Sequence, residues 1–325
     1  MKLPRRQFLH LAAGAAAVPV ASRIALAQNY PARQVRVIAG FPAGGPVDIV
    51  ARLVGQTLSE RLGQTFFIDT HPGAGGNVAT ELVVRAPADG YTLLVVGPPA
   101  AINTTLYVKL SFDFLDDIAP VAGFMSVPYV MEVTPSFPAK TVPEFIAYAK
   151  ANPGKINFAS GGNGAGQQIA GEMFKMMTGV NMVHVPYRGG ALALVDLMAG
   201  EVQMMIDPMS SSIEYIRAGK LRALAVASAT RSDALPDLPT VADFVPNYEM
   251  SAWYGLCAPK KTPAELIDKL NKEINAGLAD SRMKARIADL GGTPLLGSPG
   301  DFGKRIAEDT EKWGKVIQTA NIKAE

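Results

Sequence analysis

The sequence has 325 residues, of which 48% are hydrophobic and 18% are charged. This composition is typical of a globular protein, and the length exceeds what one hydrophobic core usually serves, so we expect two lobes. The formal net charge of +2, without basic runs interleaved with aromatic residues, argues against a nucleic-acid partner.

The first 27 residues have the layout of an export signal. A basic start that contains the Arg5-Arg6 pair precedes an Ala/Leu/Val-rich stretch, and Ala-Leu-Ala at 25–27 supplies an A-x-A cleavage site. The arginine pair favours the twin-arginine route over the general secretory route. We therefore expect cleavage after Ala27 and a periplasmic mature chain that begins at Gln28.

Apolar runs alternate with amphipathic helical patterns along the first third of the mature chain. The patterns predict strands at 34–41, 65–70 and 91–97, with helices at 48–63 and 77–86 between them. This β-α-β-α-β order predicts a parallel sheet with helices on both faces.

A second series of elements follows a possible crossing strand at 128–133. It comprises expected strands at 156–160, 182–187, 202–207 and 221–228, and helices at 142–152, 166–179, 191–200 and before Gly219. A strand at 251–259 and helices near 263–279, 281–290 and 299–320 close the chain.

The final helices have no strands of their own, so we expect the chain to return near residue 250 to complete the first lobe. The predicted division is a signal at 1–27, lobe 1 at 28–130 plus 251–325, and lobe 2 at 131–250. Two crossings between lobes form a hinge, which allows closure around a ligand.

Four expected strands run into loops of small residues, at 41–48, 71–77, 97–103 and 160–168. Open α/β sheets bind ligands at the carboxyl ends of their strands. Glycine allows close backbone approach, and the N-terminus of the next helix offers unpaired N–H groups to an anion. The alternative is that these loops only turn the chain.

Motifs for catalysis and cofactor binding are missing. The loop 73–79 lacks the G-x-G-x-x-G spacing of dinucleotide sites, and no P-loop or G-x-S-x-G motif occurs. His71 and His184 have no metal-ligating neighbours at suitable spacing, and Cys257 lies in an apolar run typical of a buried thiol. We expect no catalytic residue, metal or cofactor, although paired carboxylates that meet only in space would leave no such motif.

Seven segments in order resemble the periplasmic receptors of tripartite tricarboxylate transporters, often called the Bug family. They are FPAGGPVDIVARL, GAGGNVATELVVRAPADGYTLL, AINTTLY, INFASGGNGAGQQIAGEMFK, VPYRGGALALVDLMAGEVQMMID, GKLRALAVAS and SDALPDLPTVAD. The resemblance implies a two-lobed type II periplasmic-binding-protein fold, each lobe a mostly parallel sheet flanked by helices. It also implies a carboxylate held between the loops at 41–45 and 160–168, with Asp207 facing the cleft.

We expect ligand contacts from residues of these loops and of neighbouring strand ends. The candidates are Phe41, Ala43, Gly44, Gly45, Asn103, Ser160, Gly161, Asn163, Gly164, Gln168, Arg188 and Asp207. Three of them have a second interpretation: Asn103 and Asp207 as helix caps, and Arg188 as a solvated surface charge.

The function these features favour is a monomeric receptor that delivers a small carboxylate to a membrane transporter. The alternatives are a periplasmic enzyme acting on a small acid and a subunit that presents ligand to a membrane sensor kinase, because one fold serves all three. Dicarboxylates, tricarboxylates, acidic amino acids and aromatic acids all remain open as ligands.

Overall fold

The computed structural model describes residues 30–323. The predicted export signal and its cleavage after Ala27 lie outside the described residues. Within residues 30–323, no helix combines the length and the apolar composition that a membrane crossing requires.

Three parallel strands open the chain in the order β2-β1-β3. They are β1 (Val35–Ala39), β2 (Phe66–Thr70) and β3 (Thr92–Val96), with helices α2 (Pro46–Leu62), α3 (Asn77–Val84) and α4 (Pro98–Leu106). Helix α4 lies where the sequence predicted only a loop. Its start fits Pro98 and Pro99, because proline is tolerated in the first turn of a helix.

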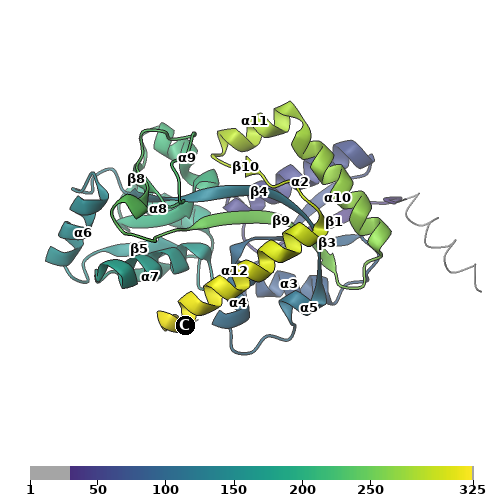
Figure 1. Cartoon of the computed structure of the whole chain (residues 1–325), viewed down its shortest axis with the longest axis horizontal. Coiled ribbons are helices and arrows are strands. Elements are labelled where there is room, and N and C mark those ends of the chain that lie inside the picture. The colour runs from purple at the N-terminus through teal and green to yellow at the C-terminus, as the bar shows by residue number, and fades with distance from the viewer. Residues whose placement is uncertain (1–29, 324–325) are drawn as a thin grey trace, which may run out of the picture.

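The two lobes share two long strands, β4 (Ile118–Val133) and β9 (Ser251–Pro259). β4 pairs with β9 from Ile118 to Pro128 and then continues along β7 and β8. Both strands run through the middle of the molecule (Figure 1), at the two places where the sequence predicted crossings between lobes. Since β9 and β4 are antiparallel to their neighbours, the sheet is mixed, with parallel strands toward its two ends.

The second lobe repeats the alternation of strands and helices. Its elements are α6 (Val142–Ala151), β5 (Asn157–Ser160), α7 (Gly166–Thr178), β6 (Val183–Pro186), α8 (Gly190–Ala199), β7 (Met204–Pro208), α9 (Met209–Arg217) and β8 (Arg222–Val226). Strands β7, β5 and β6 continue the sheet beyond β4. The predicted helices and strands of this lobe are all present within a few residues.

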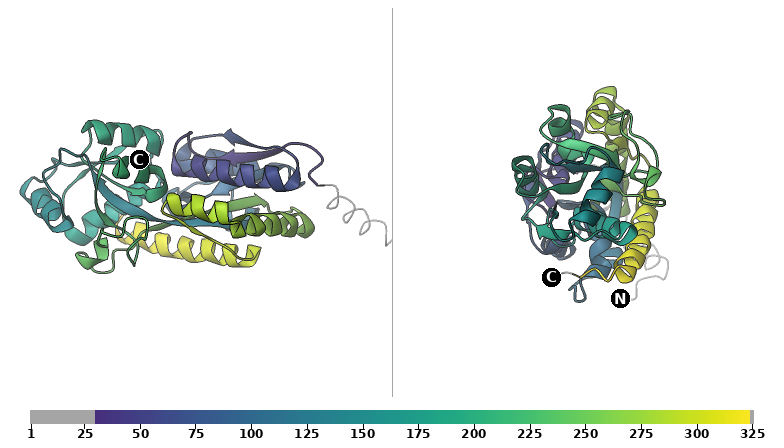
Figure 2. Two further views of the ribbon diagram at one scale, coloured as in Figure 1. Left: turned by 90° about the horizontal axis from the view of Figure 1, so that it is seen from above. Right: turned by 90° about the vertical axis from the view of Figure 1, so that its left-hand side faces the viewer.

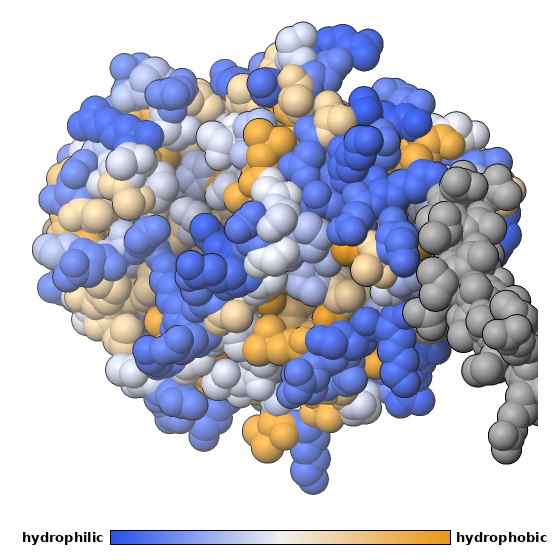
Figure 3. Space-filling view, turned by 45° about the vertical axis from the view of Figure 1, so that its right-hand side comes forward, coloured by the Kyte–Doolittle hydropathy of each residue, from blue (hydrophilic) through white to orange (hydrophobic). Residues whose placement is uncertain are grey.

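The C-terminal helices pack on the first lobe, as predicted. They are α10 (Ala264–Ala279), α11 (Ser281–Asp289) and α12 (Pro299–Thr319), of which α10 contacts α2 and α12 contacts α4. Figure 2 shows α12, in yellow, running along one side of the molecule. The buried carboxylate of Asp309 on α12 accepts hydrogen bonds from the indoles of Trp253 and Trp313, which fixes this helix to β9. The face in Figure 3 carries mostly hydrophilic side chains, with apolar ones in small groups.

Candidate functional site

A cavity of about 590 Å³ lies where loops of the two lobes meet. The loops after β1 and β2 form one wall, and the loops after β5 and β6 form the other. The lining residues are Gly40, Phe41, Pro42, Pro72, Gly73, Ala74, Gly75, Gly76, Tyr107, Gly161, Gly162, Asn163, Tyr187, Arg188 and Gly189. Nearly half of them are glycine, so the walls consist largely of backbone that a ligand can approach closely.

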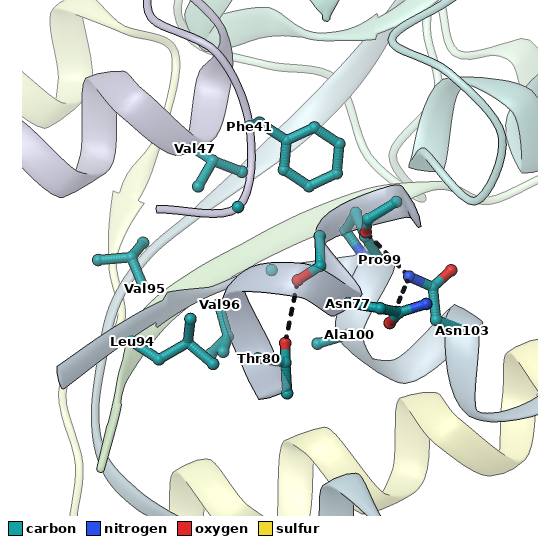
Figure 4. A pocket seen from close by; sticks show the side chains of 14 residues that line it. Phe41, Val47, Asn77, Thr80, Leu94, Val95, Val96, Pro99, Ala100 and Asn103 are labelled. Atoms are coloured by element: carbon teal, nitrogen blue, oxygen red, sulfur yellow. Dashed lines mark hydrogen bonds between the residues drawn. The ribbon is translucent and has the colours of Figure 1, made fainter. Parts of the chain in front are cut away.

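Two voids of about 20 Å³ each adjoin Phe41. One lies within the first lobe, between Phe41, Thr80, Val96 and Asn103, as Figure 4 shows. The other lies between the lobes and contacts residues of both; its walls include Gly45, Pro46, Tyr129, Gly161, Gly166, Gln167, Gly190 and Tyr254. We call this second space the interlobe void.

Three helices begin at the interlobe void. The first residues of α2, α7 and α8 are Pro46, Gly166 and Gly190, and all three line it. The first N–H groups of a helix have no partner within the helix, and its N-terminus carries a partial positive charge. Pro46 has no N–H, but its neighbours Gly45 and Val47 also line the void and have one each, so the site offers backbone N–H groups from both lobes, a setting that suits an anion.

Within residues 30–323, Arg188 is the only charged side chain that lines the cavity or either of the two voids. It is exposed in the loop between β6 and α8. Its guanidinium can bind a carboxylate through two parallel hydrogen bonds. The described residues contain no cluster of three or more His, Cys, Asp or Glu side chains that suits a metal ion.

A buried serine and a histidine support the second-lobe loop. Ser160 is fully buried, and its Oγ lies 2.7 Å from Nε2 of His184 while accepting a hydrogen bond from the Gly162 N–H. Burial, with the nearby Lys175 charge, lowers the pKa of His184 to about 4, so the ring is neutral at pH 7. A serine next to a neutral histidine is also the arrangement of an activated nucleophile. With 0% of Ser160 exposed, however, the pair is placed to hold the loop.

Gln168 supports the same loop from α7. Its Oε1 accepts a hydrogen bond from the Gly164 N–H at 2.8 Å, and its side chain is buried. Neither Gln168 nor Gly164 lines the cavity. The structure thus places Gly161 and Asn163 at the cavity, and Ser160, Gly164 and Gln168 behind them.

The first-lobe loop is held by an acidic side chain at the start of α2. Asp48 accepts a hydrogen bond from the Gly44 N–H at 3.0 Å and forms an ion pair with Arg52 at 2.9 Å. Ala43 and Gly44 are exposed and lie outside the cavity and both voids, whereas Gly45 lines the interlobe void. The Gly44 N–H is therefore engaged within its own loop in this structure.

Asn103 lies at the junction between the lobes. Its Nδ2 donates to the carbonyl of Gly75 at 2.9 Å and to Oδ1 of Asn77 at 3.1 Å, which ties α4 to the loop after β2. On its other side, Oδ1 faces Gly164 so closely that a Cβ added there would lie 2.4 Å away. Asn103 is an interior residue of α4 and not a helix cap.

Asp207 is fully buried at the end of β7 and does not line the cavity. Its Oδ1 accepts a hydrogen bond from Nε2 of Gln167 at 2.9 Å, and its Oδ2 accepts one from the Ser211 hydroxyl. Gln167 in turn lines the interlobe void. Asp207 thus acts on this space through Gln167.

The candidates divide into those that line the cavity and those that do not. The second group contains Ala43, Gly44, Gly45, Asn103, Ser160, Gly164, Gln168 and Asp207. Phe41, Gly161, Asn163 and Arg188 meet at the cavity, and their contact with a ligand stays a prediction. The sequence analysis did not select many of the lining residues; those with larger side chains include Pro42, Tyr107, Tyr129, Gln167 and Tyr187. Pro42 and Tyr187 adjoin selected residues, but nothing in the apolar run around Tyr129 distinguishes it from a core residue.

Comparison with known proteins shows the family of the chain. Residues 50–322 match the family described as the tripartite tricarboxylate transporter family receptor. Protein BugT of Bordetella pertussis is 35% identical over 300 residues, which cover 91% of this chain and 92% of that protein.

Two solved structures share the fold and contain acids. Rpa4515 of R. palustris, solved with adipate, has a TM-score of 0.88 at 36% identity, covering 90% of this chain and 99% of that one. MatC of Rhodopseudomonas palustris, with bound malate, has a TM-score of 0.84 at 31% identity, covering 89% and 100%. On this evidence the chain belongs to the tripartite tricarboxylate transporter receptor family.

Proposed function

We propose that this chain is a periplasmic receptor that captures a small carboxylate between its lobes and delivers it to a membrane transporter of the tripartite tricarboxylate type. The observation that carries the proposal is that three helix N-termini line the interlobe void while Arg188 lines the adjoining glycine-rich cavity, and that both spaces are bounded by Phe41 and Gly161. Backbone donors together with one guanidinium favour a carboxylate over a neutral solute. The adipate and malate in the two related structures support the same class of ligand.

The residues that line the cavity narrow the class of acid that it can bind. No Asp or Glu lines it among the described residues, and both oxygens of Asp207 are engaged by Gln167 and Ser211. An ammonium group bound here would have no carboxylate partner. We therefore favour an acid without an amino group, with an apolar body against Phe41, Tyr107 and Tyr187.

Several further features belong to this proposal. The mature chain begins at Gln28 after export by the twin-arginine route, and it acts as a monomer. The division into lobes at 28–130 plus 251–325 and 131–250 is part of it, and the receptor returns its ligand unchanged. A sensor kinase that receives the loaded receptor is a second partner compatible with the same cleft.

Calorimetric titration of residues 28–325 tests the proposal. The panel pairs each acid with its amide and with its α-amino derivative, such as adipate with adipamide and with 2-aminoadipate. We expect saturable binding of one or more acids, weaker binding of the amino acid and none of the amide, with the acid recovered intact. Conversion of the acid would favour an enzyme, and equal binding of acid and amide would contradict carboxylate recognition.

A further inference from the structure

Two acidic side chains, Glu132 of β4 and Asp207 of β7, are fully buried beneath the cleft. In the antiparallel pairing Asp207 lies opposite Val130, and Glu132 is two residues farther along β4. Side chains two residues apart on a strand point to the same face, so both carboxyl groups leave the sheet on one side. Such diagonal neighbours are within reach of long side chains.

The two carboxyl groups have unequal surroundings. Asp207 accepts hydrogen bonds from Gln167 and Ser211, one on each oxygen. Neither oxygen of Glu132 has a hydrogen-bond partner of normal geometry among residues 30–323, although the Ser212 hydroxyl, which is also unpartnered, lies near enough to act on the carboxyl group. An ionised carboxylate without donors is far more costly to bury than one with two donors.

No cation neutralises the pair. Arg222 of the adjoining strand β8 donates to the carbonyl of Phe137 at 2.7 Å, and neither carboxyl group forms a salt bridge within the described part of the chain. The charged groups on the packed helices have partners of their own: Glu172 with Lys175 on α7, Asp196 with Tyr187 on α8, and Glu214 with Arg217 on α9. The nearby phenols are those of Tyr129 and Tyr254. Burial raises the pKa of both phenols, so they add no charge at neutral pH.

We propose that Glu132 is a neutral carboxylic acid, that Asp207 is the group of the pair that ionises, and that ionised Asp207 positions the Gln167 amide at the base of the ligand cleft. Two charges side by side in this interior would repel without a compensating cation. Asp207 carries the charge because Gln167 and Ser211 donate hydrogen bonds to it. Glu132 keeps the proton because neither of its oxygens accepts such a bond. Asp207 is thus a positioning residue that acts through Gln167.

The order of the two ionisations follows from the same contacts. Burial is the main cause that raises the pKa of Glu132 well above its ordinary range, and the nearby Asp207 charge raises it further, against a small opposing effect of the Ser212 hydroxyl. Burial also raises the pKa of Asp207, to about 7, with Ser211 and Gln167 acting in the opposite direction. As pH rises, Asp207 therefore ionises first while Glu132 keeps its proton.

The Gln167 amide lies between two glycines of the interlobe void. A Cβ at Gly161 would be 3.6 Å from its Oε1, and a Cβ at Gly190 would be 3.4 Å from its Nε2. Protonation of Asp207 replaces a carboxylate acceptor by a neutral acid, which weakens the hydrogen bond from Nε2. Ligand affinity should then fall as pH drops through about 7, and this last step rests on the function proposed above.

Nuclear magnetic resonance of the ligand-free mature chain tests the positioning role. The side-chain amide signal of Gln167, assigned by its loss in Gln167→Met, is followed from about pH 5 to about pH 8.5. We expect it to shift with a midpoint near 7 in the parent and in Glu132→Gln, but not in Asp207→Asn. A static signal in the parent, or the same shift in Asp207→Asn, overturns the role of Asp207.

Infrared spectroscopy in heavy water tests the proton on Glu132. Above the midpoint of Asp207, the parent should retain a carbonyl band of a protonated acid that is lost in Glu132→Gln. Glu249→Gln removes an exposed glutamate and is the matched control, in which the band should remain. The parent spectrum decides the question even where a variant fails to fold, because a parent without the band contradicts a neutral Glu132. Neither measurement uses a ligand, so failure of the proposed function leaves both results interpretable.

Discussion

Gly164→Ala should prevent full closure of the lobes. Gly164 belongs to the second lobe, has φ of +80°, and faces Asn103 of the first lobe. The added Cβ would lie 2.4 Å from Oδ1 of Asn103, about 1 Å inside normal contact. Because Asn103 is held by Gly75 and Asn77, it has little freedom to give way.

The cost has two parts that a control separates. Alanine at positive φ costs about 1 kcal/mol, and that strain acts on the loop itself. Overpacking at the lobe junction adds about 1–3 kcal/mol to the closed state, which weakens binding by about 5- to 150-fold. Gly154→Ala, also in the second lobe, has φ of +74° and nothing within 4 Å of its Cβ, so it carries the strain alone.

Calorimetric titration with the tightest acid of the panel measures the difference. We expect Gly154→Ala to bind like the parent, Gly164→Ala to bind at least five times more weakly, and Asn103→Ala to restore part of the loss in the double variant. Equal affinities of Gly164→Ala and Gly154→Ala would refute the closed junction as a requirement for binding.

Three further predictions concern Arg188, His184 and Cys257. Arg188→Ala should weaken acid binding about tenfold and leave the ligand-free melting temperature unchanged, and an unchanged affinity would make Arg188 a solvated surface charge. In the unfolded chain His184 takes up a proton below about pH 6.5, but in the folded chain only near pH 4. The free energy of unfolding should therefore decrease as pH is lowered from about 6.5 to about 4, and thermal unfolding should show a smaller decrease in His184→Gln. A pH dependence identical in both proteins would show that His184 does not cause it. Burial raises the pKa of the Cys257 thiol, so a thiol reagent should modify the chain only after unfolding in guanidinium, and rapid labelling of the folded protein would disprove its burial.

The alternation of elements was predictable because each buried face leaves a periodic apolar pattern. The helices of the second lobe, from α6 to α9, are examples. The first two thirds of β4 were missed for a physical reason. Pro120 and Gly123 interrupt the strand pattern, and the structure shows register shifts next to both residues, where the strand accommodates them.

The site was only partly predictable, because a sequence locates a loop but not the direction of its side chains. The glycine-rich segments after strands contain Phe41, Gly161 and Asn163, which line one cavity in the structure, and their contact with a ligand stays a prediction. Gln167 and Gln168 are adjacent and equally polar, yet Gln167 lines the interlobe void whereas Gln168 accepts a hydrogen bond from the Gly164 N–H. The burial of Asp207 depends on β4, which lies far away in sequence.

A crystal structure of residues 28–325 with the tightest acid of the panel tests the central claim most directly. The account predicts one acid molecule in the cavity between the lobes, with a carboxylate near Arg188 and the loop at 161–163 and with the body of the acid against Phe41. An acid bound elsewhere on the surface, or in this cavity with its carboxylate turned to solvent, would contradict it.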